Sequence, residues 1–452
     1  MSDSLLSDAA RRAQHFLTGL ESRAPFPDDA ALQALETLRE QPLPEQPVDP
    51  HAVLAMIDEL GSPATVANAG GRYFGFVIGG TLPGALAANW LASAWDQNAG
   101  LEKCTPVGAA LEQGALRGLL DLLGLPEDAA GAFVTGTSMA HVTALAAARH
   151  ALLARLGWDV NQQGLSGAPP LTVIASAGAH SSVVKAVRLL GIGEARLLSV
   201  PVDEQGRMDV AQFPPSDGPT IICAQAGCVN SGAFDPIDAL ADIAAERGAW
   251  LHVDGAFGLW AAVSDSLRPL LEGYLRADSW ATDLHKWLNV PYDSGIAIVR
   301  DASQLRGAMS LSADYLTEQE EHREPFHYTP ELSRRARGVE VWAALQCLGR
   351  QGVTDLVERC CRYARRFADG LAAAGCEVLN DVELNQVLVA FGDDERTRRI
   401  INAIQQDGTC WCSDTRWQGR LAMRISVVSW RTSSEDVERS LDAMLRCVAQ
   451  YQ

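Results

Sequence analysis

Short apolar runs alternate with amphipathic segments along the chain from about residue 70 onward. Seven of these runs have the length of a strand, and they lie at 132–136, 171–176, 195–200, 220–226, 250–256, 278–283 and 295–300. Runs this apolar are typical of strands that are buried on both faces, as in parallel sheets covered by helices. The pattern therefore predicts an α/β fold with a mostly parallel central sheet and helices on both faces.

The two ends of the chain have different patterns. Residues 5–20 carry apolar side chains at helical spacing, and a proline-rich connector follows at 42–50. We expect the first 65 or so residues, which are polar and interrupted, to wrap a neighbour in this chain or another. After residue 349 an amphipathic helix and three apolar strands predict a small α+β domain. The predicted organisation is an N-terminal helical arm (1–66), a large domain (67–345) and a small C-terminal domain (346–452).

Polar residues stand at or just beyond the ends of four of the predicted strands. Hydroxyl residues at 135–138 precede an alanine-rich helix, His180 follows the second strand, Asp254 lies within 250–256, and His285 and Lys286 follow 278–283. Parallel sheets bind ligands at the carboxyl ends of their strands, so these residues are candidates for one site.

Each of these features also has a plain structural explanation. Hydroxyl residues at the start of a helix suit a phosphate, but they also act as ordinary N-caps. A lone histidine such as His180 is more often structural, whereas a buried aspartate such as Asp254 needs a compensating partner. Taken together, a phosphate cradle, an acid, an imidazole and an amine are what pyridoxal phosphate requires.

The composition draws attention to one cation. The chain has 37 lysines and arginines, and only three of these are lysines: Lys103, Lys185 and Lys286. Arginine cannot act as an amine nucleophile, so a retained lysine is a candidate for chemistry, although codon bias alone also explains the rarity.

The remaining composition excludes several classes of protein. The net charge of −19 argues against a nucleic-acid partner. The N-terminal residues lack the apolar core of a signal peptide or membrane span, so we expect a cytoplasmic protein without membrane contact. The ten scattered cysteines lack the spacing of metal ligands, and we expect no metal site.

Four stretches carry a family resemblance: "AHSSVVKA", "HVDGAFG", "TDLHKWLNVPYDSG" and "SRRARGVEVWAALQCLG". They resemble the pyridoxal-phosphate-dependent amino-acid decarboxylases, the group that includes the aromatic-amino-acid, histidine and glutamate enzymes. The resemblance runs from about residue 70 to the C-terminus. It implies a fold-type I architecture like that of aspartate aminotransferase, and a homodimer whose active sites take residues from both subunits.

The resemblance also implies roles for individual residues. Lys286 would hold the cofactor as a Schiff base, Asp254 would pair with its ring nitrogen, and His180 would stack on the ring. Ala256 would pack on the opposite face of the ring, and the phosphate would be held by Gly136, Thr137, Ser138 and His285. Asp283 and Cys228 are also implied to bind the cofactor. The sequence does not reveal the partners of Asp283, and Cys228 stands where threonine is usual.

The predicted reaction is decarboxylation of an L-amino acid to an amine and carbon dioxide. Within the segment 315–337 the resemblance suggests Tyr328 as proton donor, but its spacing from Pro330 departs from the aromatic enzymes. A missing tyrosine would favour oxidative deamination to an aldehyde.

The substrate is predicted from the stretch 71–80, which by the same resemblance corresponds to the family's segment at the substrate pocket. Phe76, Val77 and Ile78 favour an aromatic or apolar amino acid, although Arg72 leaves an acidic one open and the run is equally consistent with core packing. An aminotransferase on the same scaffold and a catalytically silent binding homologue are the alternatives.

Overall fold

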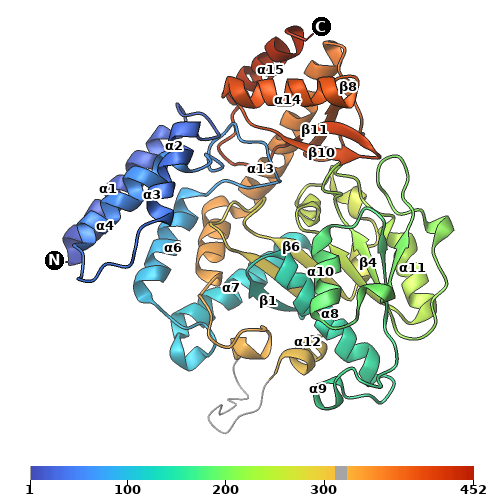
Figure 1. The fold of residues 1–452 in the computed structure, drawn as a ribbon. Coiled ribbons are helices and arrows are strands. Elements are labelled where there is room, and N and C mark those ends of the chain that lie inside the picture. The colour runs from blue at the N-terminus through green and yellow to red at the C-terminus, as the bar shows by residue number, and fades with distance from the viewer. Residues whose placement is uncertain (1, 311–322, 452) are drawn as a thin grey trace.

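The centre of the molecule is a seven-stranded sheet (Figure 1). The structure is a computed structural model that describes residues 2–310 and 323–451. The strand order of the sheet is β1-β7-β6-β5-β4-β2-β3, and β7 alone runs antiparallel to its neighbours. The strands are β1 Ala130–Val134, β2 Thr172–Ser176, β3 Leu197–Val200, β4 Thr220–Gln225, β5 Trp250–Asp254, β6 Ser279–Asp283 and β7 Gly295–Val299. The predicted mostly parallel sheet is confirmed.

Both faces of the sheet are covered, because successive strand residues point into two different cores. Phe133 and Val253 face one core, whereas Ala132 and His252 point to the opposite face. The helices on the first face are α7 Pro106–Leu123, α11 Ile237–Arg247 and the start of α13 Gly338–Ala373; those on the second are α8 Thr137–Ala154, α10 Ser181–Leu189 and α12 Ala302–Met309, with α9 Val160–Gln163 beyond them.

Short helical turns connect these elements. They are η2 Glu102–Cys104, η3 Glu194–Arg196, η4 Val210–Gln212, η5 Gly258–Val263, η6 Arg268–Leu271, η7 Tyr274–Arg276 and η8 Pro325–His327. None of the helices that the structure describes is long and apolar enough to cross a lipid bilayer.

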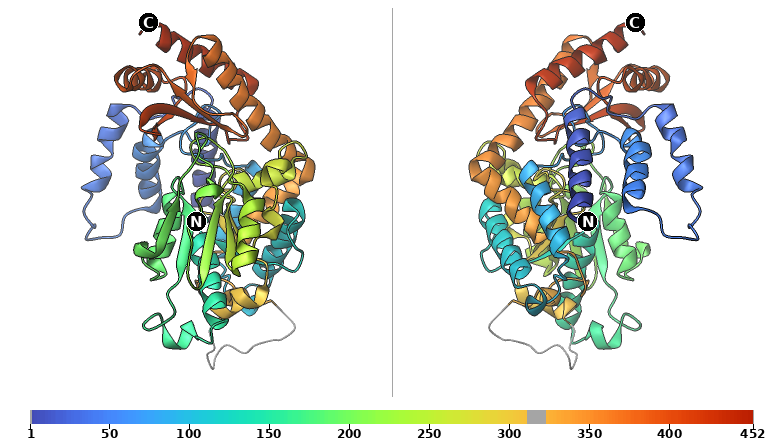
Figure 2. Two further views of the ribbon diagram at one scale, coloured as in Figure 1. Left: turned by 90° about the vertical axis from the view of Figure 1, so that its right-hand side faces the viewer. Right: turned by 90° about the vertical axis from the view of Figure 1, so that its left-hand side faces the viewer.

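The C-terminal part is an α+β unit seated on one end of the large sheet domain (Figure 2). The long helix α13 enters it after a break at Gly349, whose φ of 60° and ψ of 179° are not helical. The unit has an antiparallel sheet of order β10-β11-β9-β8, built from β8 Glu377–Val378, β9 Gln386–Ala390, β10 Ser413–Trp417 and β11 Arg420–Ser426, and helices α14 Asp394–Asp407 and α15 Ser434–Ala449.

Strand β10 was not among the predicted strands. Its five residues, "SDTRW", bury Ser413 and leave Asp414 and Arg416 exposed, so the strand shows no apolar run. Such a strand is recognisable only from its pairing with β11, which begins directly after a turn at Gln418 and Gly419.

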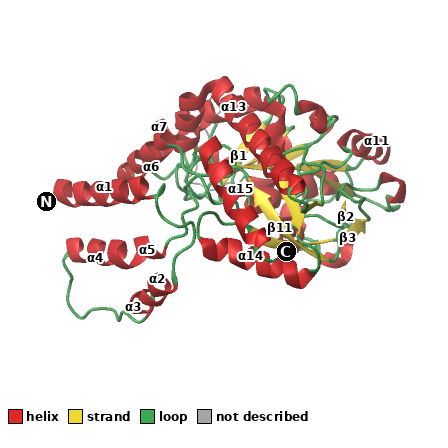
Figure 3. Cartoon of the chain, turned by 90° about the horizontal axis from the view of Figure 1, so that it is seen from above, coloured by secondary structure: helices red, strands yellow, loops and turns green. Residues whose placement is uncertain are grey.

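The N-terminal residues form an arm of helices that extends away from the body (Figure 3). The arm contains α1 Ser2–Gly19, α2 Asp29–Ala34, α3 Glu36–Arg39, α4 Pro50–Met56, η1 Ile57–Gly61 and α5 Ser62–Ala64. The predicted helix at 5–20 is confirmed. The predicted connector is also confirmed except at Pro50, which begins α4, because proline suits the first position of a helix.

The arm has almost no core of its own. No residue of α2, α3, α4, η1 or α5 is buried in the single chain. After the arm, α6 Pro83–Trp95 leads into the large domain, and it buries only Ala85 and Ala92 although most of its residues are apolar.

Candidate active site

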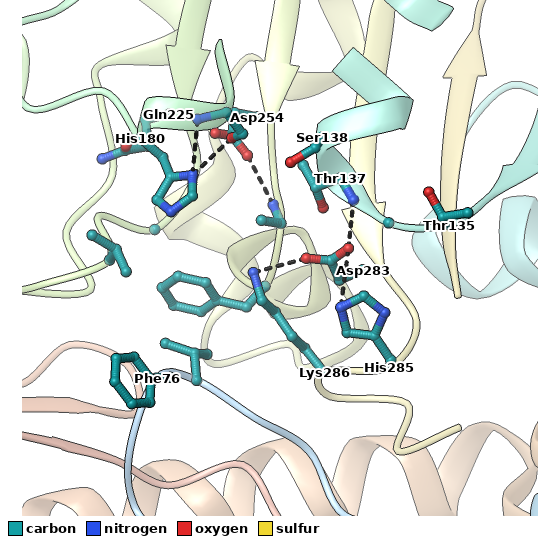
Figure 4. A pocket seen from close by; sticks show the side chains of 17 residues that line it. Phe76, Thr135, Thr137, Ser138, His180, Gln225, Asp254, Asp283, His285 and Lys286 are labelled. Carbon is teal, nitrogen blue, oxygen red and sulfur yellow. Dashed lines mark hydrogen bonds and ion pairs between the residues drawn. The ribbon is translucent and has the colours of Figure 1, made fainter. Parts of the chain in front are cut away.

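The carboxyl ends of β1, β2, β4, β5 and β6 meet at one cavity of about 330 Å³ (Figure 4). Eleven of the fourteen predicted site residues line this cavity: Phe76, Val77, Gly136, Thr137, Ser138, His180, Asp254, Ala256, Asp283, His285 and Lys286. The sheet therefore gathers side chains that are up to 210 positions apart in the sequence, from Phe76 to Lys286.

One end of the cavity has the features of an anion cradle. Helix α8 begins there at Thr137, and the N-terminal end of its dipole favours negative charge. A Cβ atom on Gly136 would lie 3.0 Å from His285 Cε1 and 3.2 Å from Asp283 Oδ1, so glycine keeps this space open. The hydroxyl of Thr137 is buried and has no partner among the described residues.

The structure supplies the partners of Asp283 that the sequence did not reveal. Asp283 Oδ1 accepts a hydrogen bond from the backbone N–H of Thr137 at 2.6 Å, and Oδ2 lies 2.8 Å from Lys286 Nζ. Burial alone would raise the pKa of the Asp283 carboxyl, but the charges of Lys286 and His285 hold it below its ordinary value. Asp283 is therefore a carboxylate that orients the lysine.

The imidazole of His285 is fixed in one orientation. Its Nδ1 accepts a hydrogen bond from the backbone N–H of Ser294 at 3.1 Å, and its ring stacks on Tyr292 at a centroid distance of 4.3 Å. Burial lowers the pKa of His285, with Asp283 acting in the opposite direction. In the neutral ring Nε2 therefore carries the proton, and this donor lies 3.5 Å from Asp283 at the cradle.

Lys286 stands on a tightly packed loop. The following residues Trp287 and Leu288 are completely buried, and the backbone of Gly79 approaches so closely that a Cβ there would lie 2.0 Å from the carbonyl oxygen of Lys286. The Nζ atom lies 5.9 Å from the ring centroid of Phe257, inside the cavity. The amine is thus held at a defined place by a rigid backbone.

Asp254 and His180 lie together at the other end of the cavity (Figure 4). Asp254 Oδ1 accepts from the backbone N–H of Ala256 at 3.1 Å. Burial acts to raise the pKa of Asp254, but His141, His180 and Lys286 together lower it well below the ordinary carboxyl value.

His180 is oriented by the start of helix α10. Its Nδ1 accepts from the backbone N–H of Ser182 at 3.2 Å, so its Nε2 carries the proton of the neutral ring. Burial lowers the pKa of His180, although Asp254 acts in the opposite direction. A neutral, oriented imidazole beside a carboxylate suits stacking on a cationic aromatic ring.

Three predicted residues do not line this cavity. The Sγ atom of Cys228 faces Gly206: a Cβ atom added to Gly206 would lie 3.5 Å from this sulfur. The cavity wall is formed instead by the neighbouring residues Gly227 and Val229. Ile78 is half-buried outside the cavity, because positive φ angles of 56° at Phe76 and Val77 turn the chain there.

Tyr328 is the third residue outside the cavity. Its ring packs beneath Arg323, whose guanidinium lies 4.2 Å from the ring centroid, and against the core that contains α8. Within the predicted segment 315–337, residues 315–322 lie outside the described part of the chain.

Arg72 has a structural role in the fold, which overturns the interpretation that it could serve an acidic substrate. Its guanidinium donates to the carbonyl oxygens of Thr409 (3.0 Å), Glu21 (2.9 Å) and Arg23 (3.3 Å). The side chain is 4% exposed and is absent from the cavity lining, so it joins the arm to the C-terminal unit.

Sequence reasoning missed two polar residues near the site. Gln225 ends β4 and lines the cavity, and its buried Nε2 has no partner in the described ranges. The strand-end rule that found Asp254 would also have found Gln225. His141 on α8 lies behind Asp254, and it has no comparable sequence signal because its neighbours are alanine and valine.

Comparison with known proteins identifies the family. Residues 45–392 match the pyridoxal-dependent decarboxylase conserved domain, which is well over half of the chain. The chain belongs to the pyridoxal-dependent decarboxylase family.

Relatives within this family differ in their substrates. The chain is 28% identical over 395 residues to an aromatic-L-amino-acid decarboxylase of Bacillus atrophaeus, covering 81% of this chain and 78% of that protein. It is 31% identical over 330 residues to the acidic amino acid decarboxylase of Mus musculus, covering 70% of this chain and 59% of that protein.

Solved structures of two proteins share the fold. Oryza sativa TDC with PLP and tryptamine matches with a TM-score of 0.91 at 24% identity, covering 99% of this chain and 98% of that one. Mouse CSAD matches with a TM-score of 0.89 at 22% identity, with the same coverage. The predicted fold-type I architecture is confirmed by these likenesses.

The cavity of this decarboxylase fits pyridoxal phosphate. The unpartnered Thr137 hydroxyl and the open cradle at Gly136 suit the phosphate, and a lysine and a carboxylate stand at separate places in the same cavity. When bound, the cofactor supplies an electron sink that weakens the bonds at the α-carbon of an amino acid attached to it. Among the described residues no cluster of three or more metal-ligating side chains is found.

Proposed function

We propose that this pyridoxal-phosphate-dependent amino-acid decarboxylase acts on an L-amino acid with an aromatic or apolar side chain. The observation that carries this proposal is the chemistry of the cavity wall. Phe76, Val77, Val229 and Phe257 line it, and Lys286 is the one lysine or arginine among the lining residues that the structure describes. Because Lys286 is paired with Asp283, the lining formed by residues 2–310 and 323–451 of the single chain offers no free lysine or arginine for an acidic side chain.

The positions of the lining residues support a role for each of them. Lys286 would hold the cofactor's aldehyde carbon through its amine, and the start of α8, with Thr137 and His285, would bind the phosphate. Asp254 would keep a proton on the ring nitrogen, because a buried carboxylate stabilises a cationic ring. His180 would cover one face of the ring, and Ala256 is small enough that it would allow close approach on the other.

We also propose that the active form is a homodimer. Trp90, Leu91 and Trp95 on α6 are 43%, 55% and 40% exposed in the single chain, which is unusual for neighbouring large apolar residues. The arm that precedes α6 has no buried residue between α2 and α5. Both features support a second copy of the chain covering α6 and the arm.

A screen of the twenty amino acids and cysteine sulfinate tests the proposed substrate class. Carbon dioxide and amine are measured together, with aldehyde and hydrogen peroxide assayed in parallel. We expect kcat/KM for tryptophan, tyrosine or phenylalanine to exceed that for aspartate, glutamate and cysteine sulfinate by about tenfold or more, as placing a carboxylate against an apolar wall is unfavourable.

Three other results would contradict parts of this proposal. Preference for an acidic substrate would overturn the assignment from the cavity wall. Aldehyde and peroxide formed in step with carbon dioxide would place the enzyme in the oxidative branch. Amino transfer to a 2-oxo acid without carbon dioxide would indicate an aminotransferase.

A further inference from the structure

A chain of buried polar groups extends from Asp254 away from the cavity. His141 Nε2 lies 3.4 Å from Asp254 Oδ2, and His141 Nδ1 lies 2.9 Å from His252 Nε2. His252 Nδ1 lies 2.9 Å from Ser279 Oγ, which in turn accepts a hydrogen bond from Trp250 Nε1 at 2.8 Å. Both histidines and Ser279 are completely buried.

The two end groups of this hydrogen-bonded series, Trp250 and Asp254, determine the direction of its hydrogen bonds. An indole N–H can only donate, and a carboxylate can only accept. With both imidazoles neutral, Trp250 donates to Ser279, Ser279 to His252, His252 to His141, and His141 to Asp254. In this arrangement each hydrogen bond of the series has one donor and one acceptor. The last donor, which faces Asp254, is His141 Nε2.

The charge state of His252 agrees with this direction. Burial lowers the pKa of His252 to about 3, although Asp254 acts in the opposite direction. His252 is therefore neutral at physiological pH, and it can donate from Nε2 only if Nδ1 accepts from Ser279.

A structural explanation is that these groups merely satisfy one another in the core. Two observations favour a connection to the site. The series of hydrogen-bonded side chains does not form a closed ring but ends at Asp254, a carboxylate that lines the cavity. In addition, His141 Nε2 has no hydrogen-bond partner of ideal geometry within the described residues, and Asp254 Oδ2 is the acceptor that it faces.

We propose that His141 is a positioning residue for Asp254: supported by His252, Ser279 and Trp250, it holds the carboxylate toward the cavity as an anion and thereby maintains the proton on the ring nitrogen of the bound cofactor. This inference rests on the proposed role of Asp254. A buried carboxyl without a donor takes up a proton, and a neutral acid cannot stabilise a cationic ring.

Other titratable groups also act on Asp254. His180 approaches from the start of α10 and Lys286 from the loop after β6, and both favour the carboxylate. Burial raises the pKa values of Cys223 and Asp235 on the neighbouring strand and loop, and Asp254 adds to both shifts. His141 differs from His180 and Lys286 because it does not line the cavity, so replacing it leaves the groups proposed to contact the cofactor in place.

The test is the protonation state of the cofactor's ring nitrogen, read by nitrogen-15 NMR of enzyme loaded with ring-labelled pyridoxal phosphate. We expect the ring nitrogen of the wild-type holoenzyme to remain protonated from pH 6 to pH 9. In His141→Leu we expect its protonation midpoint to fall by at least about one pH unit, a tenfold loss of proton affinity, and to become visible in this range. His141→Gln, which retains a donor at the Nε2 position, should resemble the wild type.

A histidine on the same helix provides the matched control. The ring of His150 packs over Gly307 of α12, away from the cavity, and His150→Gln should leave the nitrogen signal unchanged. If His141→Leu does not fold, His141→Asn replaces it, because its shorter amide does not reach Asp254. A ring nitrogen that stays protonated as in the wild type in a folded, loaded His141→Leu or His141→Asn enzyme overturns the inference.

The variant Asp254→Asn separates this inference from the proposed function. If Asp254→Asn also leaves the ring nitrogen protonated across the range, the proposed role of Asp254 fails. If Asp254→Asn removes the proton but the donor-less variants at His141 do not, the role of Asp254 stands and the inference about His141 alone is wrong.

Discussion

At the residue scale, one carboxylate and a rigid loop hold Lys286 in place. Asp283 lies 2.8 Å from its Nζ, and the backbone on both sides is buried. The other two lysines stand elsewhere: Lys103 is in η2 and Lys185 is an exposed residue of α10. The chemistry assigned to the rare lysine thus depends on its surroundings rather than on its rarity.

The first prediction concerns this amine. Lys286→Ala should remove the covalent link to the cofactor and lower kcat by about a thousandfold or more, because a nucleophile and its positioning are lost together. The measurements are the visible absorption of the cofactor and carbon dioxide release. Lys185→Ala is the matched control and should leave both unchanged; equal losses in the two variants would contradict the assignment.

The second prediction concerns the pH dependence of stability. His252 has its pKa lowered from 6.5 to about 3, so below about pH 6.5 the unfolded chain binds a proton that the folded chain excludes. This histidine therefore makes the free energy of unfolding decrease as the pH falls. Between pH 7 and pH 5 its contribution is about 2 kcal/mol.

Denaturant unfolding of His252→Gln at these two pH values checks the prediction. The variant should lose about 2 kcal/mol less than the wild type over the same interval. The exposed His15 of α1 is the control, and His15→Gln should retain the wild-type slope. An unchanged slope in His252→Gln would show that His252 is not held neutral.

At the element scale, close backbone contacts fit the strands to the site. A Cβ on Gly295, the first residue of β7, would lie 2.5 Å from Gly136 Cα, so the antiparallel strand passes directly beside the start of α8. A Cβ on Gly75 would lie 2.2 Å from the ring of Trp411. The approach of Gly75 to Trp411 and the stacking of Phe76 on the same ring, at a centroid distance of 5.6 Å, hold this stretch over the cavity.

The third prediction concerns the break in α13. Gly349 has a φ of 60° and a ψ of 179°, a conformation that is essentially restricted to glycine, and a Cβ there would meet no other atom within 4 Å. Gly349→Ala should therefore lower the free energy of unfolding by about 1–3 kcal/mol through backbone conformation alone. Gly61→Ala is the control, because Gly61 has helical angles and open space, and it should be neutral or stabilising.

Denaturant unfolding of both variants distinguishes these effects. Equal stability changes in the two variants would indicate that the break at Gly349 is not a required conformation. A loss confined to Gly349→Ala would show that the folded protein requires the non-helical conformation at this residue.

At the scale of the whole molecule, the single chain leaves one region incomplete. The arm extends from the body without buried residues between α2 and α5, and α6 exposes neighbouring tryptophan and leucine side chains (Figure 3). Apolar surface of this kind gains stability when another surface covers it.

The fourth prediction follows from the proposed homodimer. Light scattering should give the wild type a mass of twice the 48.4 kDa of the chain, whereas Leu91→Glu with Trp95→Glu should shift it toward the single chain and reduce activity. Leu156→Glu is the control, because Leu156 is as exposed as Leu91, at 55%, but lies beyond α8. A wild-type protein of 48.4 kDa would contradict the proposal.

Much of the fold could be predicted from the sequence because its signals are local. Apolar runs marked all seven strands of the large sheet to within two residues, and polar residues at or just beyond the strand ends marked Asp254, His180 and Lys286. Strand β10 was not predicted because its alternating polar residues resemble those of a loop. His141 was not predicted because its importance arises from Asp254, a neighbour 113 positions away.

The sequence by itself determined the strand positions, the polar strand ends and the family, since each depends on residue type and spacing. Only the tertiary structure decided that β7 runs antiparallel, that Cys228 and Ile78 turn away from the cavity, and that Arg72 anchors the arm. The physical reason is that side-chain direction depends on φ, ψ and packing partners distant in the chain. The same reason explains why the donors to Asp283 became visible only when β6 and α8 were brought together.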